Sequence, residues 1–559
     1  MRVKNLPRVG SVPPMSMNLG SAMRTLVGWL VVVELVSGIL QGYYTPLYTD
    51  IARHLGIHDA DVNIFEAAQL MVSAVCVPVF AKLGDTLGYR RMLLWSSAIT
   101  AIGSWAVVVA PTSLTFTLAW AVQGAYVAWL PLDVALISAR ARLQARGEAG
   151  GPVGEAAADH RLTAKGSGII VAALQAGAII GAVAGGQLGV FAPSALPAVL
   201  AVPAVCVTVV VLVVATRVPE APEVPGGSLD AGGAVWLSLA LLGVGIGLTV
   251  LRLQGLGSPP AWGLVALGLL LFIPFVRHEM RSPDPLIDIR VVRGAQMWPI
   301  IVASFLFGVG VLGAQGPLST FARTDPAVYG YGLGLTSIGV SGMILGYVLA
   351  TLTGALLQSP VARRLGGRRT LLMATVVVTA GYAALLALHG QVVTMLGAMV
   401  LIGVGNGALI AALPAAAASA APPHRTAMAT GLNNTTKTVG GMVASAVFAL
   451  ALLSGSHQTL AGEDGTAGSL SGYLIVWIVC AVTALVAAVF LAAAPRGSFE
   501  GAQDAGSSLI DEADPAGPGR AVDVAGAGVR ISSGPGSTAP GSPSSAPSLD
   551  LALDQETAD

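Results

Sequence analysis

The sequence predicts an all-α polytopic membrane protein, because the chain is strongly apolar, its apolar residues fall in long runs, and its basic residues gather in every second connection. Hydrophobic residues make up 54% of the 559 residues and charged residues only 10%, whereas an ordinary soluble domain carries about 25% charged residues. So few charges would leave the surface of a soluble protein of this length largely apolar. Runs of about twenty apolar residues can cross a bilayer as helices, in which the backbone satisfies its own hydrogen bonds.

These runs give fourteen candidate spans. The first seven lie at residues 25–47, 63–81, 93–110, 114–137, 166–190, 195–215 and 231–251. The second seven lie at residues 261–277, 297–320, 334–357, 371–388, 393–416, 428–453 and 471–494. The span at 261–277 is short, so a count of twelve or thirteen remains an alternative.

The basic residues favour one orientation of these spans. With the N-terminus inside, the inner connections contain Lys82, Arg90, Arg91, Arg140, Arg142, Arg146, Arg161, Lys165, Arg277, Arg281, Arg290, Arg293, Arg363, Arg364, Arg368 and Arg369. The outer connections contain Arg53, Arg252 and Arg323. The positive-inside rule describes this asymmetry, and a shift of one helix would scramble it. We therefore predict an even number of spans with both termini in the cytoplasm.

An internal repeat indicates how the spans are grouped. The segment 87–94, LGYRRMLL, recurs at 365–372 as LGGRRTLL, once after the second span and once after the tenth. An offset of eight helices fits two six-helix bundles with two helices inserted between them, and repeated halves are common in transporters. The expected divisions are a cytoplasmic N-terminal segment 1–24, an N-terminal bundle 25–216, the inserted helices with their linkers 217–296, a C-terminal bundle 297–495 and a disordered cytoplasmic tail 496–559.

The connection at 81–91 carries the first recognisable motif. Its sequence, AKLGDTLGYRR, resembles the signature G-x-L-x-D-x-x-G-x-R-R/K between helices 2 and 3 of the major facilitator superfamily, with Ala81 in place of the first glycine. The matching positions are Leu83, Asp85, Gly88, Arg90 and Arg91. The resemblance implies a cytoplasmic gate, in which Asp85 faces the positive N-terminal end of the thirteenth span. The alternative is a short basic loop with one compensating acid.

The fifth span carries a second motif. Residues 177–188, GAIIGAVAGGQL, are similar to the antiporter signature G-x-x-x-G-P-x-x-G-G-x-L of the same superfamily, with Ala182 in place of proline. The matching glycines are Gly177, Gly181, Gly185 and Gly186. Glycines at these spacings allow close helix contact, and we expect that contact to be with a helix of the other half. The alternative is ordinary packing of small residues.

Two further features bear on the resemblance. The fourth span shows Gln123 and Gly124 of the pattern R-x-x-Q-G, but Trp120 stands at the arginine position that the family links to proton coupling. The helix count and the segment 277–290 resemble the fourteen-helix drug/proton antiporter family over residues 25–494. The first span lacks the usual aspartate pattern of that family, which indicates a divergent branch.

Charged residues inside spans are costly and often functional. Glu34 lies near the middle of the first span, where we expect it to carry the coupling proton; the alternative is a structural glutamate bonded to a neighbouring helix. Asp133, near the inner end of the fourth span, is expected to pair with basic loop residues, and a role in proton coupling is the alternative. Lys437 in the thirteenth span is a possible partner of Glu34 or of an anionic substrate, and a snorkelling lysine is the alternative.

Polar residues on the central helices are candidates for the lining of a cavity. They are Gln41, Tyr44, Gln123 and Asn406. The alternative for each is a role in packing or in a hydrogen bond between helices.

The function expected from these features is secondary active transport. The leading hypothesis is proton-coupled export of a small organic, amphipathic compound across a bacterial plasma membrane by a monomer in the lipid bilayer. An importer of a metabolite with the same fold and a non-transporting membrane sensor remain alternatives. We expect no enzyme activity, no cofactor, no metal and no nucleic-acid partner, because the sequence shows no paired catalytic residues in spans, no metal-ligand spacing and no phosphate-binding loop in a strand–helix context.

Overall fold

The computed structural model describes residues 20–148, 152–220, 230–420, 426–455, 458–461 and 465–493. The expected N-terminal segment up to residue 19 and the expected tail 496–559 lie outside these ranges. The earlier helices are α1 (Ser21–Tyr43), α2 (Tyr48–Leu55), α3 (Val62–Leu87), α4 (Tyr89–Val109), α5 (Ser113–Gln123), α6 (Trp129–Glu148), α7 (Pro152–Leu188), α8 (Ala192–Thr216), α9 (Ala231–Gln254) and α10 (Pro259–Glu279). The later helices are α11 (Ile289–Val292), α12 (Trp298–Val311), α13 (Gln315–Arg323), α14 (Pro326–Tyr329), α15 (Ser337–Leu365), α16 (Gly367–Leu388), α17 (Val392–Ala420), α18 (Thr426–Leu452) and α19 (Leu470–Ala493).

The helices that cross the membrane confirm the predicted fold class. Within the described ranges, thirteen segments are long and apolar enough to span a bilayer. One of them, Leu162–Thr216, has 55 residues and contains α7 from Leu162 onward together with α8. A 3-10 turn at Gly189–Phe191 separates these two helices, and the backbone is also non-helical at Ala195, near the start of α8. The described chain therefore makes fourteen helical passes, and the short predicted span at 261–277 is the 21-residue helix α10.

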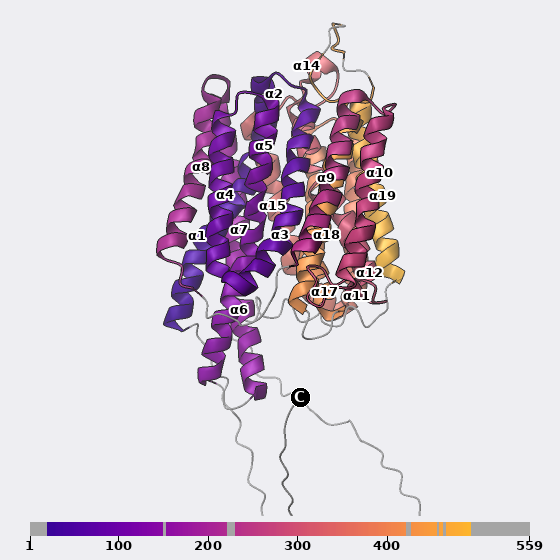
Figure 1. The fold of residues 1–559 in the computed structure, drawn as a ribbon. Helices are drawn as coiled ribbons and strands as arrows, with labels where there is room; N and C mark the ends of the chain where they lie inside the picture. The colour runs from indigo at the N-terminus through magenta and orange to yellow at the C-terminus, as the bar shows by residue number, and fades with distance from the viewer. Residues whose placement is uncertain are drawn as a thin grey trace, which may run out of the picture. The chain divides into compact units, whose positions relative to one another are not determined.

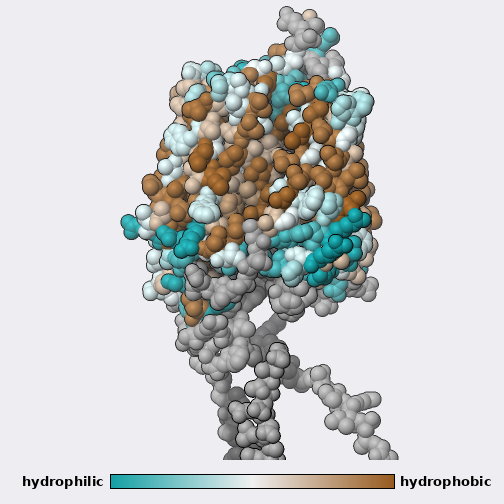
Figure 2. All heavy atoms as spheres, in the orientation of Figure 1, coloured by the Kyte–Doolittle hydropathy of each residue, from teal (hydrophilic) through white to brown (hydrophobic). Residues whose placement is uncertain are grey.

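An apolar belt crosses the bundle on the face that Figure 2 shows. On the face shown in Figure 2, hydrophobic side chains cover the middle of the bundle and hydrophilic ones gather toward its two ends. Helix α1 begins and α19 ends at the same end of the bundle (Figure 1). By the positive-inside rule this is the inner end, and we call the opposite end the outer end.

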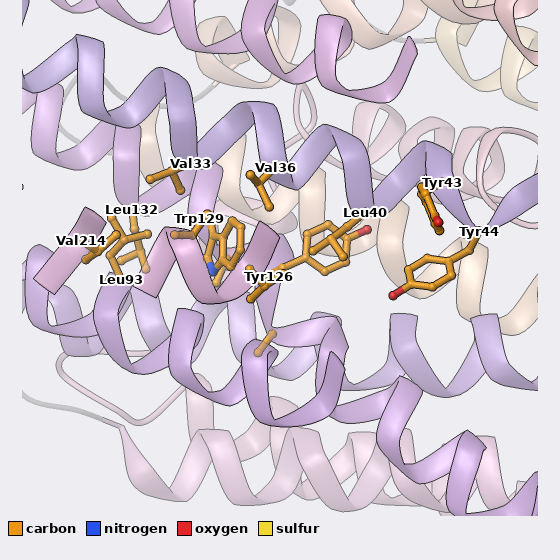
Figure 3. Packing of buried hydrophobic residues seen from close by; sticks show 14 of the residues in the cluster. Val33, Val36, Leu40, Tyr43, Tyr44, Leu93, Tyr126, Trp129, Leu132 and Val214 are labelled. Atoms are coloured by element: carbon orange, nitrogen blue, oxygen red, sulfur yellow. The ribbon is translucent and has the colours of Figure 1, made fainter. Parts of the chain in front are cut away.

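Buried side chains form a separate core in each half of the chain. We use N-terminal half for α1 to α8 and C-terminal half for α12 to α19. One apolar cluster joins residues from Met23 to Val218, and a second joins mainly residues from Met297 to Leu491. Figure 3 shows part of the first cluster, in which Val33, Val36 and Leu40 of α1 lie in a row beside Trp129 of α6.

The sequence repeat is also a repeat of local structure. Gly88 ends α3 with a φ of 98°, and Gly366 ends α15 with a φ of 87°. These positive φ values favour glycine, which lacks the Cβ that would clash. Each glycine is followed directly by the next helix, α4 or α16, so that both copies turn the chain tightly at the inner end.

Of the two inserted helices, α9 packs against the seam between α3 and α18, and α10 packs against α9. Leu237, Leu241 and Val244 of α9 join a third apolar cluster with Ala74 of α3 and Met442 of α18. An ion pair at each end also ties the inserted segment to α3. Arg252 lies 2.5 Å from Asp61 at the outer end, and Lys82 pairs with Asp284 at the inner end. Both ion pairs attach the inserted helices to the N-terminal half.

Two predicted spans are interrupted helices. The span expected at 114–137 is α5, a 3-10 segment at Gly124–Ala128, and α6. The span expected at 297–320 is α12 and α13, separated by a turn at residues 312–314. Interrupted helices at membrane depth are tolerated where the backbone is covered by protein or lines a cavity, so both breaks mark the interior of the transporter-like bundle.

Candidate functional site

Glu34 and Asp133 meet in the interior of the N-terminal half. Both are fully buried, Glu34 on α1 and Asp133 on α6. Each carboxyl group acts on the ionisation of the other, so the two are neighbours, and within the described residues none of their four oxygens has a hydrogen-bond donor. Two ionised carboxylates are acceptors only, so a hydrogen bond between them requires a proton on at least one. The geometry is therefore suited to holding a proton between two helices.

The expected partners of these acids are elsewhere. The basic loop residues predicted to pair with Asp133 are not beside it, because α6 places its side chain inward against Glu34. Lys437 on α18 is half-buried, and no ion pair joins it to an acid in the described part of the chain. The predicted pairing of Lys437 with Glu34 is thus not present in this structure.

Gln123 forms a hydrogen-bond centre that joins four helices. It is fully buried at the end of α5. Its amide nitrogen donates to the Tyr44 hydroxyl at 2.9 Å and to Ser104 Oγ at 3.0 Å, and its oxygen accepts from Gln69 Nε2 at 3.3 Å. These partners come from the end of α1, from α4 and from α3. Two predicted cavity residues, Tyr44 and Gln123, are therefore in direct contact.

Aromatic side chains cover this centre. The Trp120 ring contacts the Tyr44 ring edge-on at 4.5 Å between centroids and stacks on Phe116 at 5.6 Å. Trp120, which replaces the arginine of the family pattern, is 2% exposed. At this position the chain has a buried aromatic surface in place of a positive charge.

The other two predicted cavity residues lie apart. Gln41 is exposed and follows Glu34 by seven residues on α1, which puts both on one helix face. Asn406 on α17 is buried in the C-terminal half, where its amide nitrogen donates to the Tyr347 hydroxyl at 3.0 Å. Asn406 also borders an apolar recess with Phe307 and Leu413. The structure therefore groups Glu34, Tyr44 and Gln123 in one half and leaves Asn406 in the other.

At the outer end, hydrogen bonds join the two halves. Arg323 of α13 donates to Asp50 of α2 at 2.6 Å, and both side chains are largely buried. Ser337 of α15 donates to the same carboxylate at 3.3 Å. Ser319 Oγ donates to the Thr45 carbonyl at 2.6 Å. These bonds connect α2 and its preceding turn to α13 and α15.

At the inner end, the residues of the predicted gate motif have local partners. Asp85 is exposed and accepts a hydrogen bond from Tyr89, four residues later. Arg90 donates to the carbonyls of Val214 and Ala215 at the C-terminal end of α8, where a helix favours a cation. Leu83 is half-buried at the inner end of α3, and Arg91 donates to the Leu87 carbonyl at 3.5 Å. In this structure the Asp85 carboxylate thus pairs with its own loop.

The glycines of the second motif face two different helices. A Cβ added to Gly177, Gly181 or Gly185 would overlap the backbone of α1 at Leu35, Ile39 or Tyr43. The expectation that these glycines contact the other half is therefore wrong for three of the four, because their four-residue spacing puts them on the face of α7 that packs on α1. Gly186 lies about 100° further round the helix and faces Ser341 of α15 in the C-terminal half. Ser341 also donates to the Ala182 carbonyl at 2.6 Å.

Several buried charged residues were not singled out from the sequence. Glu66 on α3 is 7% exposed and accepts a hydrogen bond from the Tyr48 hydroxyl. Asp50 and Arg323 were treated as loop residues, although they form the outer ion pair. The available signal was an acid within the predicted span 63–81 and opposite charges at the outer ends of two spans. Within the described residues, no group of three His, Cys, Asp or Glu side chains is placed to hold a metal ion.

The fold and this buried polar centre define a multi-pass helical membrane protein of the transporter type. The chain belongs to the Major Facilitator Superfamily, whose family model matches residues 30–445. Members of this superfamily are transporters that bind small-molecule substrates.

Curated relatives cover most of the chain. The chain is 24% identical over 435 residues to the uncharacterized MFS-type transporter YwoD of Bacillus subtilis, covering 76% of this chain and 87% of that protein. It is also 24% identical over 487 residues to the puromycin resistance protein pur8 of Streptomyces alboniger, covering 83% of this chain and 90% of that protein.

Solved structures share the fold. A POT family peptide transporter in an auto-inhibited form matches with a TM-score of 0.57 and 15% identity, covering 83% of this chain and 96% of that one. The nucleoside transporter NupG matches with a TM-score of 0.55 and 16% identity, covering 85% of this chain and 99% of that one.

Proposed function

We propose that this protein exports small amphipathic organic compounds in exchange for protons across a bacterial plasma membrane. The observation that carries the proposal is the buried Glu34–Asp133 pair, which can hydrogen-bond only when it holds a proton. A buried carboxylate without a positive partner is costly to keep charged. A change in the protonation state of this pair therefore changes the free energy of the packed bundle strongly.

Alternating access provides the link between this proton and the substrate. We infer two units that move relative to each other, residues 25–216 and 297–495, with the inserted helices attached to the first by the Arg252–Asp61 and Lys82–Asp284 ion pairs. The outer ends are joined through Asp50 and Arg323, while Asp85 at the inner end is exposed. These contacts support an assignment of the structure to a state that is closed toward the outside.

The direction of transport is proposed from two observations. The glycine motif of α7 resembles that of antiporters, and one relative is named for puromycin resistance. Import is the second candidate, because Ala182 and Trp120 replace the proline and arginine of the family patterns. Both relatives named above are bacterial, which supports the proposed membrane.

Transport by purified protein in liposomes tests the proposal. With a pH-sensitive dye inside and an imposed proton gradient, addition of puromycin or another amphipathic cation should collapse the gradient for the wild type but not for Glu34→Gln. Asp325→Asn is the matched control, since Asp325 is an exposed helix cap at the outer end and asparagine also caps helices. A gradient response that is unchanged in Glu34→Gln would refute the coupling role, and labelled compound moving inward would favour the importer.

A further inference from the structure

Two buried oxygen atoms on α3 lack a hydrogen-bond donor. Asn63 is fully buried and Glu66 is 7% exposed. They lie three residues apart on α3, so their side chains share one helix face. Within the described part of the chain, neither Asn63 Oδ1 nor Glu66 Oε2 has a hydrogen-bond partner. Buried polar atoms are nearly always paired, so two such acceptors on one face require an explanation.

The remaining atoms of both side chains are fixed by neighbours. Asn63 Nδ2 donates to the Ala60 carbonyl at 3.1 Å, which determines the orientation of the amide and directs Oδ1 away from Ala60. The Tyr48 hydroxyl donates to Glu66 Oε1 and leaves Oε2 without a partner. Each side chain thus presents one free acceptor.

Both free acceptors point toward the same place in the other half. A Cβ added to Gly316 of α13 would lie 2.7 Å from Asn63 Oδ1 and 3.6 Å from Glu66 Oε2. The two oxygens are therefore neighbours, and a residue with a side chain at 316 would intrude on them. Gly316 is the second residue of α13, next to the break between α12 and α13, so the site combines α3 of one half with an interrupted helix of the other.

Among the described residues, no basic side chain forms an ion pair with the Glu66 carboxylate. The titratable groups that act on it are the phenols of Tyr48 and Tyr126. The first turn of α13 contributes only a partial positive charge. Tyr126 also interacts with Glu34 and thus lies between the two acidic sites.

We propose that Glu66 and Asn63 bind a cation, a proton or Na⁺, at the seam between α3 and α13. A proton on Glu66 supplies the donor that both oxygens lack, and a Na⁺ ion uses both as oxygen ligands. Glu66 is the fifth residue of α3, about 6 Å from its outer end at 1.5 Å per residue. When the outer ends separate, α13 leaves α3 and the site opens to the outside. The cation thus enters from outside and is enclosed in the state seen here, an assignment that rests on the proposed exchange transport.

Infrared difference spectroscopy of the purified full-length protein tests this site without any substrate. The spectra are recorded during a pH titration in choline chloride and then during addition of NaCl at fixed pH, with binding of radioactive sodium measured in parallel. The variants are Glu66→Gln, Gly316→Ala and the control Asp325→Asn. If the cation is a proton, a carboxylic acid band titrates with pH, is lost in Glu66→Gln, shifts in Gly316→Ala and does not respond to Na⁺. If it is Na⁺, NaCl but not choline chloride removes the band, and Glu66→Gln loses sodium binding.

The opposite results overturn the proposal. A titrating band and a level of sodium binding that are both unchanged in Glu66→Gln mean that the site holds no cation. If Glu66→Gln does not fold, Gly316→Ala decides the question, because it keeps the carboxylate and fills the space from the other half; an unaltered spectrum then refutes the site. If Glu34→Gln loses proton-driven transport while Glu66→Gln changes neither the band nor sodium binding, this site alone is rejected. A Glu66 signal in a protein without exchange activity would support the site and reject the exchange mechanism.

Discussion

The carboxyl groups of Glu34 on α1 and Asp133 on α6 face each other in the interior of the N-terminal half, and within the described residues no ion pair joins either to a basic side chain. Two neighbouring carboxyl groups cannot both be ionised at low cost in a buried site. The pair therefore behaves as one unit whose proton occupancy changes the interaction between α1 and α6. Such a unit can transmit a change in protonation to helix packing.

Removal of either acid should stabilise the protein at alkaline pH. In Asp133→Asn the amide becomes a donor to Glu34, so repulsion is replaced by a hydrogen bond that contributes about 1 kcal/mol. Glu34→Gln should act in the same direction. Because the two residues are in contact, the double variant should gain less than the sum of the single variants. Thermal unfolding in detergent at pH 8 measures this cycle, and a lower midpoint for either single variant would contradict the pairing.

Loss of the outer ion pair should open the outer end. Truncation of one partner of a buried ion pair costs about 3–5 kcal/mol. Here the truncation destabilises only the state in which Arg323 contacts Asp50. In a protein without its three native cysteines, Gln41→Cys should react at least about tenfold faster with an impermeant maleimide from outside when Arg323→Ala is added, since 1.4 kcal/mol is a factor of ten.

Arg53→Ala is the matched control for this labelling experiment. Arg53 approaches the same Asp50 carboxylate at 3.6 Å, but its side chain is 68% exposed and belongs to the same half as Asp50. Exposed pairs contribute little, so labelling of Gln41→Cys should not change. Equal acceleration by both arginine variants would show that the Asp50 charge as a whole, and not its bond to α13, holds the outer end closed.

A single methyl group at the α1–α7 contact should destabilise the fold. In Gly177→Ala the new Cβ would overlap the Leu35 carbonyl of α1, so the helices must separate, at a cost of about 1–3 kcal/mol. Gly28→Ala on α1 is the control, because a Cβ there meets nothing within 4 Å and alanine favours helix by about 0.5–1 kcal/mol. Midpoints of thermal unfolding should fall for the first variant and stay or rise for the second.

The sequence was sufficient for the spans because a lipid-crossing helix must be apolar along its length. It was less informative for α6 and α7. Helix α6 continues to Glu148 and α7 begins at Pro152, so both extend beyond the predicted spans. These extensions carry many charged residues, and hydropathy gives no signal for a polar helix. They project from the inner end of the bundle in Figure 1.

The site was predictable only in part. Glu34 could be predicted as a functional residue, because its position in the middle of an apolar span makes a buried charge costly. The partner could not be predicted, because whether Asp133 faces a loop or Glu34 depends on the rotation of α6 after the 3-10 segment at Gly124–Ala128. The contacts of the α7 glycines depend in the same way on which face of the helix packs on α1. Hydrophobic pattern does not determine that rotation in helices that are apolar on all sides.

The stability contributed by Asp230, the N-cap of α9, should be present at neutral pH and be lost only in acid. Burial alone would raise the pKa of Asp230, but the backbone N–H of Gly233 at 2.8 Å and His278 at 2.7 Å hold it below its usual range. A carboxylate with a lowered folded-state pKa contributes stability that is fully present above the unfolded pKa of about 3.9 and is lost as the pH falls through the lower folded value. Asp230→Ala should therefore lower the free energy of unfolding by about 1 kcal/mol, the usual contribution of a helix cap, at pH 6 as well as at pH 8. Chemical denaturation in detergent at the two pH values measures this difference, and a penalty at pH 6 that is less than half of that at pH 8 would show that the Asp230 carboxyl already takes up a proton there.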